Sequence, residues 1–349
     1  KLVNHILDLS AHGRAEFETH HAFVSLLIEQ FIFEENKNVV YGLAKMMERN
    51  MLSREPVWNA LNKLIRIKLH PEIKRYLKKG NAEGEIEPIT SLVAGTISVL
   101  GQPLGIGQGN NPTCQSARGI SMWSRHSPGK LLNMIIEAGV SNQLEFRYEG
   151  ELIKSTGITA EKEEQFDFQL DPVSVVLVPN LDSIYNQMMQ KAMVKHIQED
   201  PHVSVNPAFY GHWIQTGFLS CYNRLMNAIA KFDHFVKVFY ASFHPEFNDG
   251  NHLIYPVPLG IFITSSQGEM LGFHAVSLMR VQKDDKGQWR AYFFNPNNEG
   301  RQNWGQGIKP TVARNGEIHG ESSLPFHEFL SRVYAFHYNN LGIDERLPQ

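Results

Sequence analysis

Apolar residues recur at intervals of three and four from the start of the chain to about residue 80, which is the spacing of one helix face. The pattern predicts helices over residues 14–34, 37–49, 53–67 and 71–79. A segment rich in glycine and glutamate, Gly80–Pro88, interrupts the periodicity and is typical of a linker. We therefore expect an N-terminal α-helical region over residues 1–85 and a second region over residues 86–349.

Beyond the linker the pattern is mixed. Helical spacing returns over residues 115–123, 130–138, 181–198, 217–230 and 324–338. Runs rich in β-branched and aromatic residues predict strands over residues 142–151, 173–178, 253–264, 272–281 and 289–294. The late strands follow one another without regular helical crossovers, which favours an α+β fold over a doubly wound parallel sheet.

Composition narrows the class of protein. The chain has 349 residues, 42% of them hydrophobic, which is enough to bury a sizeable core. A net charge of −3 gives no global basic field, so we expect no nucleic-acid partner. No apolar run approaches the ~20 residues that a membrane helix needs, so we expect a soluble protein.

The chain has two cysteines, Cys114 and Cys221, which excludes a disulfide framework and favours a reducing compartment. Cys221 lies in an apolar stretch and is assigned to the core. Cys114 lies between a loop rich in Gly, Asn and Pro and a predicted helix, which is a setting where a thiol becomes reactive.

Cys114 would occupy the first turn of that helix. Unpaired N–H groups and the helix dipole there favour the thiolate and lower the thiol pKa from about 8.5. The preceding glycines allow the chain to reverse and bring the Gln108 amide towards the sulfur, so Gln108 and the Cys114 N–H could form an oxyanion hole. Taken alone, the pattern also fits a buried thiol at a helix start.

His274 and Asn295 flank a predicted hairpin whose turn is Lys283–Gly287. The turn lies midway between them, so we expect the two residues to face one another or to lie one step apart. Opposed side chains in a sheet are close enough for an asparagine carbonyl to accept from an imidazole. Alone, His274 would more often be a structural histidine. A thiol, a base, an orienting group and an oxyanion donor in one chain favour thiol-dependent acyl transfer.

These residues resemble the papain-like cysteine peptidase superfamily. Within it, His274-Ala-Val and Phe293-Phe-Asn295-Pro are similar to bacterial effector peptidases of the YopT/AvrPphB type. The resemblance covers residues 105–124 and 268–300. Two residues differ from the family pattern: Gln115 follows the cysteine where papain-like enzymes often have Trp, and Asn295 stands where the effectors usually have Asp. Trp304 is similar to the Trp that shields the papain asparagine, but lies further along the chain.

The resemblance implies a papain-like fold, in which a helix with the cysteine packs on an antiparallel sheet with the histidine and asparagine. It implies Cys114 as nucleophile, His274 as general base and acid, Asn295 as orienter and Gln108 as oxyanion donor. The resemblance also implies a protein or peptide substrate, no cofactor and a role in virulence. An effector of this type would be secreted into a host cell.

Two alternatives stay open. The same residues would serve a deamidase or a transglutaminase, because a thioester can pass its acyl group to water or to an amine. A non-catalytic helical binding module is the alternative from another class.

Two other features of the sequence are less specific. The histidines do not have metal-ligand spacing, so no metal is expected. Seven basic residues within 63–79 favour a solvated helix face over membrane contact.

Overall fold

The computed structural model describes residues 7–80, 86–155, 157–158, 160–197, 199–223, 226–251, 253–265, 267, 269–297, 302–341 and 343. The fold is mixed α+β, as expected. The chain divides into two compact units, unit 1 over Lys1–Gln187 and unit 2 over Met188–Gln349. The predicted boundary between residues 85 and 86 is not tested by this division, because residues 81–85 of the predicted linker lie outside the described residues, and it stays a prediction.

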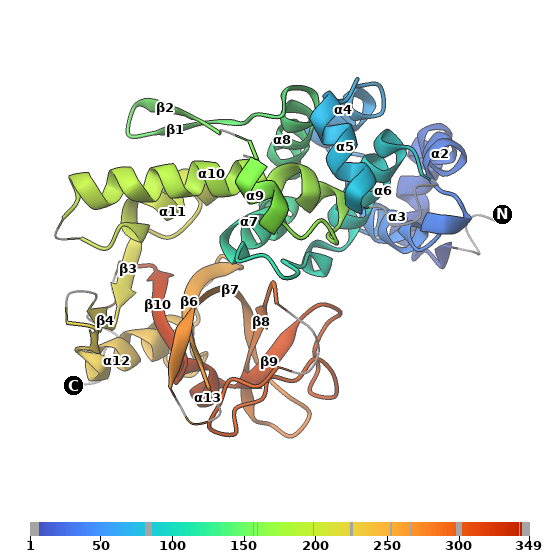
Figure 1. Ribbon diagram of the computed structural model, residues 1–349. Coiled ribbons are helices and arrows are strands. Elements are labelled where there is room, and N and C mark those ends of the chain that lie inside the picture. The colour runs from blue at the N-terminus through green and yellow to red at the C-terminus, as the bar shows by residue number, and fades with distance from the viewer. Residues whose placement is uncertain are drawn as a thin grey trace. The chain divides into compact units, whose positions relative to one another are not determined.

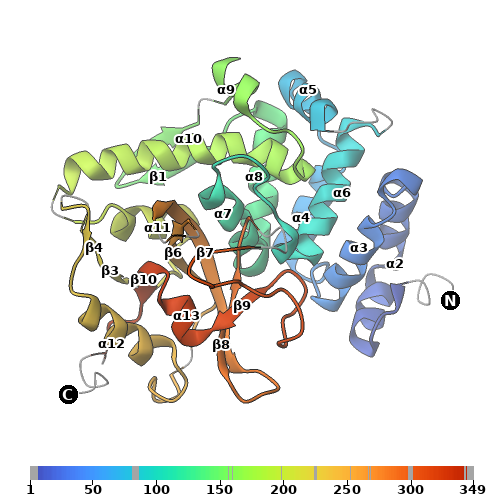
Figure 2. The same cartoon turned by 60° about the horizontal axis from the view of Figure 1, so that its bottom comes forward.

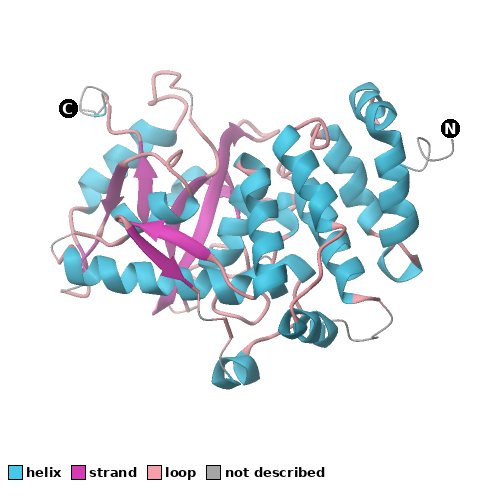
Figure 3. Ribbon diagram, turned by 90° about the horizontal axis from the view of Figure 1, so that it is seen from above, coloured by secondary structure: helices cyan, strands magenta, loops and turns pink. Residues whose placement is uncertain are grey.

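Unit 1 is mostly helical. Its helices are α2 (Ala11–Phe31), α3 (Val39–Glu48), α4 (Glu55–Leu64), α5 (Pro71–Gly80), α6 (Pro88–Gly101), α7 (Cys114–His126), α8 (Pro128–Ser141), α9 (Ala160–Gln165) and the first part of α10 (Pro172–Lys195), with short 3-10 turns η1 (Glu34–Asn36) and η2 (Pro103–Gly105). One hairpin interrupts them, formed by β1 (Glu145–Tyr148) and β2 (Glu151–Lys154). The four predicted N-terminal helices are therefore confirmed, and Figure 3 shows most of the described part of unit 1 as helix.

The helices on either side of residues 81–85 pack against one another. A Cβ atom on Gly101 of α6 would lie 2.0 Å from the Gly42 carbonyl oxygen of α3, so the two backbones approach at glycines. The same part of α6 leads through η2 into the loop before α7, and Ser124 of α7 donates to the Val99 carbonyl at 2.7 Å. The helix that begins at Cys114 is thus held on a helical scaffold, which Figure 1 shows in blue to green.

Unit 2 contains a six-stranded antiparallel sheet with strand order β3-β10-β6-β7-β8-β9. Its strands are β3 (Gly217–Ser220), β6 (Val257–Thr264), β7 (Met270–Lys283), β8 (Trp289–Phe294), β9 (Ser322–Pro325) and β10 (Val333–Tyr338). The helices of unit 2 are α11 (His202–Tyr210), α12 (Phe232–Phe243) and α13 (Phe326–Leu330), and a two-stranded ribbon joins β4 (Tyr222–Asn223) to β5 (Ala228–Ile229). The predicted strands at 272–281 and 289–294 are confirmed, and the one predicted over 253–264 is confirmed from Val257 onward.

The core of unit 2 lies between α12, α13 and one face of the sheet, as Figure 2 allows the reader to follow. Phe239 and Phe336 are fully buried with their ring centroids 5.0 Å apart. Alternate residues of β6 and β7, including Ile261 and Val276, point into the same cluster. Because side chains alternate along a strand, His274 lies on this face too, where the apolar core ends.

Three predicted elements are wrong. Residues 173–178 form no strand but lie in α10, because Pro172 and an Asp171 carboxylate that accepts from the Ser174 N–H at 3.0 Å begin a helix there. Residues 217–230 form β3, β4 and β5 instead of a helix, since Gly217–Ser220 pairs with β10, a strand more than 100 residues away. Residues 324–338 contain only the short helix α13, between β9 and β10. Long-range pairing decided the last two cases.

Among the described residues, no helix combines the length and apolar character needed to cross a bilayer.

Candidate functional site

Helix α7 begins at Cys114, as predicted from the sequence. The preceding Thr113 has φ −120° and ψ 31°, and its side chain makes no capping hydrogen bond to the first turn. The Cys114 side chain is half-buried, and it forms no disulfide with Cys221 or any other described residue. A thiol at this position lies at the positive end of the helix dipole, where a thiolate is favoured.

The loop before Cys114 makes two successive turns. The Asn111 N–H donates to the Gln108 carbonyl at 3.2 Å, and the Thr113 N–H donates to the Asn111 carbonyl at 2.8 Å. Gly109 has φ +56°, a left-handed conformation that glycine adopts without a steric penalty. These turns give the chain reversal that was expected between Gln108 and Cys114.

Asp167 fixes this loop from outside. The Asn111 side chain donates to the Asp167 carbonyl at 2.9 Å and accepts from the Asp167 N–H at 2.8 Å. The Asp167 carboxylate accepts from the Asn110 side chain at 3.0 Å. Asn111 is 3% exposed, so this pairing is a buried anchor. Sequence reasoning missed Asp167 because it lies 56 residues from Asn111, and only an Asn-rich loop hinted at such a partner.

Two polar side-chain atoms of the loop before Cys114 are buried without a partner in the described part of the chain. They are the Gln108 Oε1 atom and the Thr113 hydroxyl. A buried polar atom without a hydrogen bond costs about 1–3 kcal/mol, and native proteins leave few of them without a reason. A polar group of a bound substrate would satisfy them. Gln108 itself is half-buried, which agrees with a side chain that lines a site.

In unit 2, His274 and Asn295 are in contact as the sequence predicts, but as a diagonal pair, neither directly opposite nor one step apart. His274 Nε2 lies 2.6 Å from Asn295 Oδ1, and the two residues are 6% and 2% exposed. Asn295 follows directly after the last residue of β8, where Pro296 ends the pairing. The neighbouring Asn297 is exposed, and Asn298 lies outside the described residues.

A β-bulge in β7 brings the two side chains onto one face. From the hairpin turn the register pairs Lys283 with Trp289, but between Leu278 and Arg280 it shifts by one residue. Beyond the shift, continued pairing would place Asn295 opposite Val276, two residues from His274. Residues two apart in a strand share a face, so the pair is a diagonal one. Without the bulge Asn295 would point to the other face.

Two groups that can only donate fix the polarity of this pair. The Asn297 backbone N–H donates to Asn295 Oδ1 at 2.9 Å, so the atom at that position must be the oxygen. His274 Nε2 faces the same oxygen and must therefore carry the proton. The neutral imidazole then has its lone pair on Nδ1, which is the nitrogen that would act as the base.

Gln302 and Trp304 lead to the same assignment from the other side. The Trp304 indole, which can only donate, lies 3.0 Å from Gln302 Oε1, and that oxygen also accepts from Asn295 Nδ2 at 2.6 Å. The indole packs on Phe293, with ring centroids 5.2 Å apart, and is 5% exposed. Gln302 is a residue that the sequence analysis missed, whereas the nearby Trp304 had been noted.

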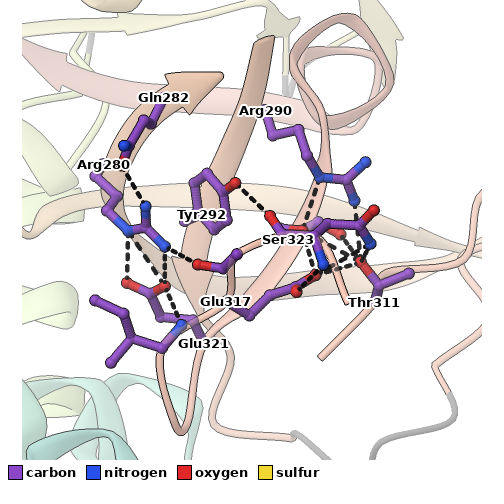
Figure 4. Close-up of polar contacts among 11 residues, drawn as sticks. Arg280, Gln282, Arg290, Tyr292, Thr311, Glu317, Glu321 and Ser323 are labelled. Carbon is purple, nitrogen blue, oxygen red and sulfur yellow. Dashed lines mark hydrogen bonds and ion pairs between the residues drawn. The ribbon is translucent and has the colours of Figure 1, made fainter. Parts of the chain in front are cut away.

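A second polar network holds the far end of the loop that carries Gln302 (Figure 4). Arg280 forms an ion pair with the buried Glu321 at 2.7 Å, and its guanidinium lies 3.6 Å from the Tyr292 ring centroid. Burial acts to raise the pKa of Glu317, but hydrogen bonds from the Thr311 and Ser323 hydroxyls outweigh it and lower the pKa to about 2. Because these charges have partners, we interpret the network as a structural brace.

The surroundings of the other cysteine, Cys221, make its thiol unreactive. Cys221 is 1% exposed in the unit 2 core, and burial raises the pKa of its thiol to about 11. Its assignment to the core is confirmed, although it lies between β3 and β4 and not in a helix. Within the residues that the structure describes, no group of three or more His, Cys, Asp or Glu side chains is placed to bind a metal ion.

The two halves of the predicted site belong to different compact units. Gln108 and Cys114 lie in unit 1, and His274 and Asn295 in unit 2, where the structure brings the latter two together. No known protein-family model matches the chain, and no curated protein matches it either.

Proposed function

We propose that the chain is a thiol-dependent acyl-transfer enzyme of papain-like fold, acting on a peptide or amide bond of a protein substrate. Cys114 is the nucleophile, His274 the general base and acid, and Asn295 the group that orients the imidazole. Gln108 and the Cys114 N–H donate to the oxyanion. The reaction needs no cofactor, because the thiolate and the imidazolium supply both the attacking electron pair and the proton.

In the first half-reaction, His274 Nδ1 accepts the Cys114 proton and the sulfur attacks the substrate carbonyl carbon. The imidazolium then gives that proton to the departing amine, which leaves a thioester on Cys114. In the second half-reaction His274 takes a proton from water, hydroxide adds to the thioester carbon, and the sulfur leaves with its proton restored. An amine in place of water would give transfer instead of hydrolysis.

The observation that supports this proposal most directly is the polarity of the His274–Asn295 pair. The Asn297 N–H donates to Asn295 Oδ1, and the Trp304 indole fixes Gln302 Oε1 as the acceptor for Asn295 Nδ2, so the His274 proton must be on Nε2. This tautomer makes Nδ1 the nitrogen that can accept the Cys114 proton, as the proposed role requires. The bulge in β7 places Asn295 on the same face as His274, and Gln302 holds the Asn295 amide.

The proposal requires the two units to present Cys114 and His274 to one another at hydrogen-bond distance, about 3 Å, in the reacting complex.

Cleavage profiling tests the function while the substrate is still unidentified. A cell lysate would be incubated with the wild-type protein, with Cys114→Ala and with Cys221→Ala, and new protein termini would be measured by mass spectrometry.

We expect new termini with wild type and Cys221→Ala but not with Cys114→Ala. Mass shifts at glutamine side chains without new termini would identify a deamidase or transglutaminase that uses the same residues. The proposal fails if Cys114→Ala produces the same changes as the wild-type protein, or if no protein in the lysate is modified.

A further inference from the structure

Helix α5 carries an open hollow that is surrounded by basic side chains, although most of its exposed surface is apolar. The described residues around it are Pro71, Lys74, Arg75, Lys78 and Lys79, and its volume is about 470 Å³. Ile73 and Tyr76 on the opposite side of the helix are buried, so the packing of α5 directs the basic side chains outward. The chain as a whole has a net charge of −3, so this concentration of positive charge is local.

The basic residues form two pairs of like charge, Lys74 with Lys78 and Arg75 with Lys79. Residues four apart are neighbours on a helix surface, and like charges at that spacing destabilise the helix by a few tenths of a kcal/mol. The repulsion between Arg75 and Lys79 is offset, because both side chains contact the Glu163 carboxylate of α9. Within the part of the chain that the structure describes, neither Lys74 nor Lys78 forms an ion pair.

The basic side chains around the hollow stabilise the negative charge of Glu163. Hydrogen bonds from Arg75 and Lys79 lower the pKa of its carboxyl group to about 2, so it is ionised at neutral pH. Lys79 also lies 5.2 Å from the Phe168 ring centroid, which limits the positions of its ammonium group. Among the described side chains, four cations thus face two carboxylates, Glu163 and the Glu72 that pairs with Arg75, which is an excess of two positive charges.

We propose that this hollow binds an anionic small molecule that carries two or more phosphate groups. The hollow is open to solvent, and its volume of about 470 Å³ leaves room for a ligand larger than one phosphate. Residues 74–79 extend about 7.5 Å along the helix axis, which suits two linked phosphates better than one. The described residues around the hollow include no large apolar side chain that would insert into a membrane, which favours a soluble ligand.

The Glu163 carboxylate then competes with the ligand for Arg75 and Lys79. A phosphate group that reaches Arg75 or Lys79 must displace or share its carboxylate, whereas Lys74 and Lys78 are open to the ligand directly. The site therefore makes two opposite predictions: loss of the two lysines should weaken binding, and loss of the Glu163 charge should strengthen it. Binding at this hollow is independent of the chemistry proposed for Cys114.

The test is calorimetric titration of the full chain with inorganic tripolyphosphate at fixed ionic strength. We expect one site per chain in the wild-type protein. Each Lys–phosphate contact contributes about 1 kcal/mol at 4 Å in water, or about fivefold in affinity. Lys74→Gln/Lys78→Gln should therefore weaken binding at least about tenfold, and Glu163→Gln should tighten it several-fold.

A double variant at exposed lysines of unit 2, Lys286→Gln/Lys309→Gln, removes the same charge and should change the affinity by less than about twofold. Because Lys74 and Lys78 repel one another, their replacement should not lower the melting temperature, which separates lost binding from lost folding. The proposal is overturned if both double variants lose affinity equally or if the wild-type protein gives no heat of binding. Capture by anionic vesicles without any response to tripolyphosphate would also overturn it, since that would indicate a charged surface and not a hollow.

Discussion

The cysteine and histidine halves of the proposed site are built in different ways. The histidine half is a closed set of hydrogen bonds at strand ends, in which each polar atom of Asn295 has a partner. The cysteine half depends on backbone geometry, with a helix start and a loop that Asp167 anchors. It leaves the Gln108 Oε1 atom and the Thr113 hydroxyl buried without partners in the described residues.

The difference indicates where a substrate would bind. A satisfied network is rigid and has little to gain from a ligand, whereas buried polar atoms without partners recover about 1–3 kcal/mol each when a ligand supplies them. We therefore expect the histidine half to be formed in advance and the cysteine half to be completed by the substrate. Changes in the two halves should consequently affect different kinetic constants.

The largest effect is expected from His274→Ala, which removes the base and leaves Asn295 without its imidazole. General acid–base catalysis by a positioned side chain contributes about 10²–10⁴-fold, so kcat on the substrate found by profiling should fall by that factor. The melting temperature serves as the control for folding. Turnover at the wild-type rate by His274→Ala would rule out the histidine half altogether.

Gln108→Ala tests the cysteine half. One oxyanion donor is worth about 10²–10³ in kcat, or about 2.7–4 kcal/mol, and the Cys114 N–H would remain. We expect kcat to fall and the rate of Cys114 alkylation by a small reagent to stay unchanged, because alkylation forms no oxyanion. An increase in KM with kcat intact would instead assign Gln108 to ground-state binding.

Gln302→Leu tests whether the satisfied network matters for catalysis. The substitution leaves Asn295 Nδ2 and Trp304 Nε1 without their acceptor, so only the Asn297 N–H still holds the Asn295 amide and the imidazole is oriented less firmly. A loss of about 1–3 kcal/mol in the transition state corresponds to a roughly 5- to 160-fold lower kcat.

Asn297→Ala is the matched control, because its exposed side chain makes none of these contacts and only its backbone N–H is used. It should turn over normally, and Gln302→Glu, which keeps an acceptor, should recover part of the activity. If Gln302→Leu lowers only the melting temperature, while folded protein turns over at the wild-type rate, Gln302 has a structural role alone.

The smallest effect is expected from Glu317→Gln, in the brace of Figure 4. Hydrogen bonds hold the Glu317 pKa at about 2, below its ordinary 4.5, so the ionised carboxylate stabilises the fold above pH 4.5 and that stabilisation is lost as the pH falls towards 2. The variant should lose about 1–2 kcal/mol of unfolding free energy at pH 7. Urea unfolding at several pH values should show this difference shrink between pH 4.5 and 2, whereas a constant difference would contradict the ionised network.

The sequence predicted those features that depend on local pattern. The helix start at Cys114, the hairpin between β7 and β8 and the choice of Asn295 over Asn297 all follow from nearby residues such as Pro296 and Gly287. The sequence did not reveal the bulge between Leu278 and Arg280, although the His274–Asn295 contact depends on it.

Local patterns could not predict the contacts between segments that are distant in the sequence. The anchor from Asp167 to Asn111 joins residues that no local periodicity links, and Gln302 lies in an irregular loop. The valine run in α10 was misread for a related reason: β-branched residues favour strands on average, but Val175 and Val176 are fully buried in a helix, where packing outweighs propensity.

The central claim is that Cys114 is a thiolate paired with the His274 imidazolium in the reacting protein. The direct measurement is the rate of alkylation at each cysteine against pH, followed by intact-protein and peptide mass spectrometry in wild type and His274→Ala. We predict fast labelling of Cys114 at pH 6, about 10²-fold slower labelling in His274→Ala, and none at Cys221, whose thiol has a pKa of about 11. Equal labelling of Cys114 in both proteins, rising only near pH 8.5, would contradict the claim.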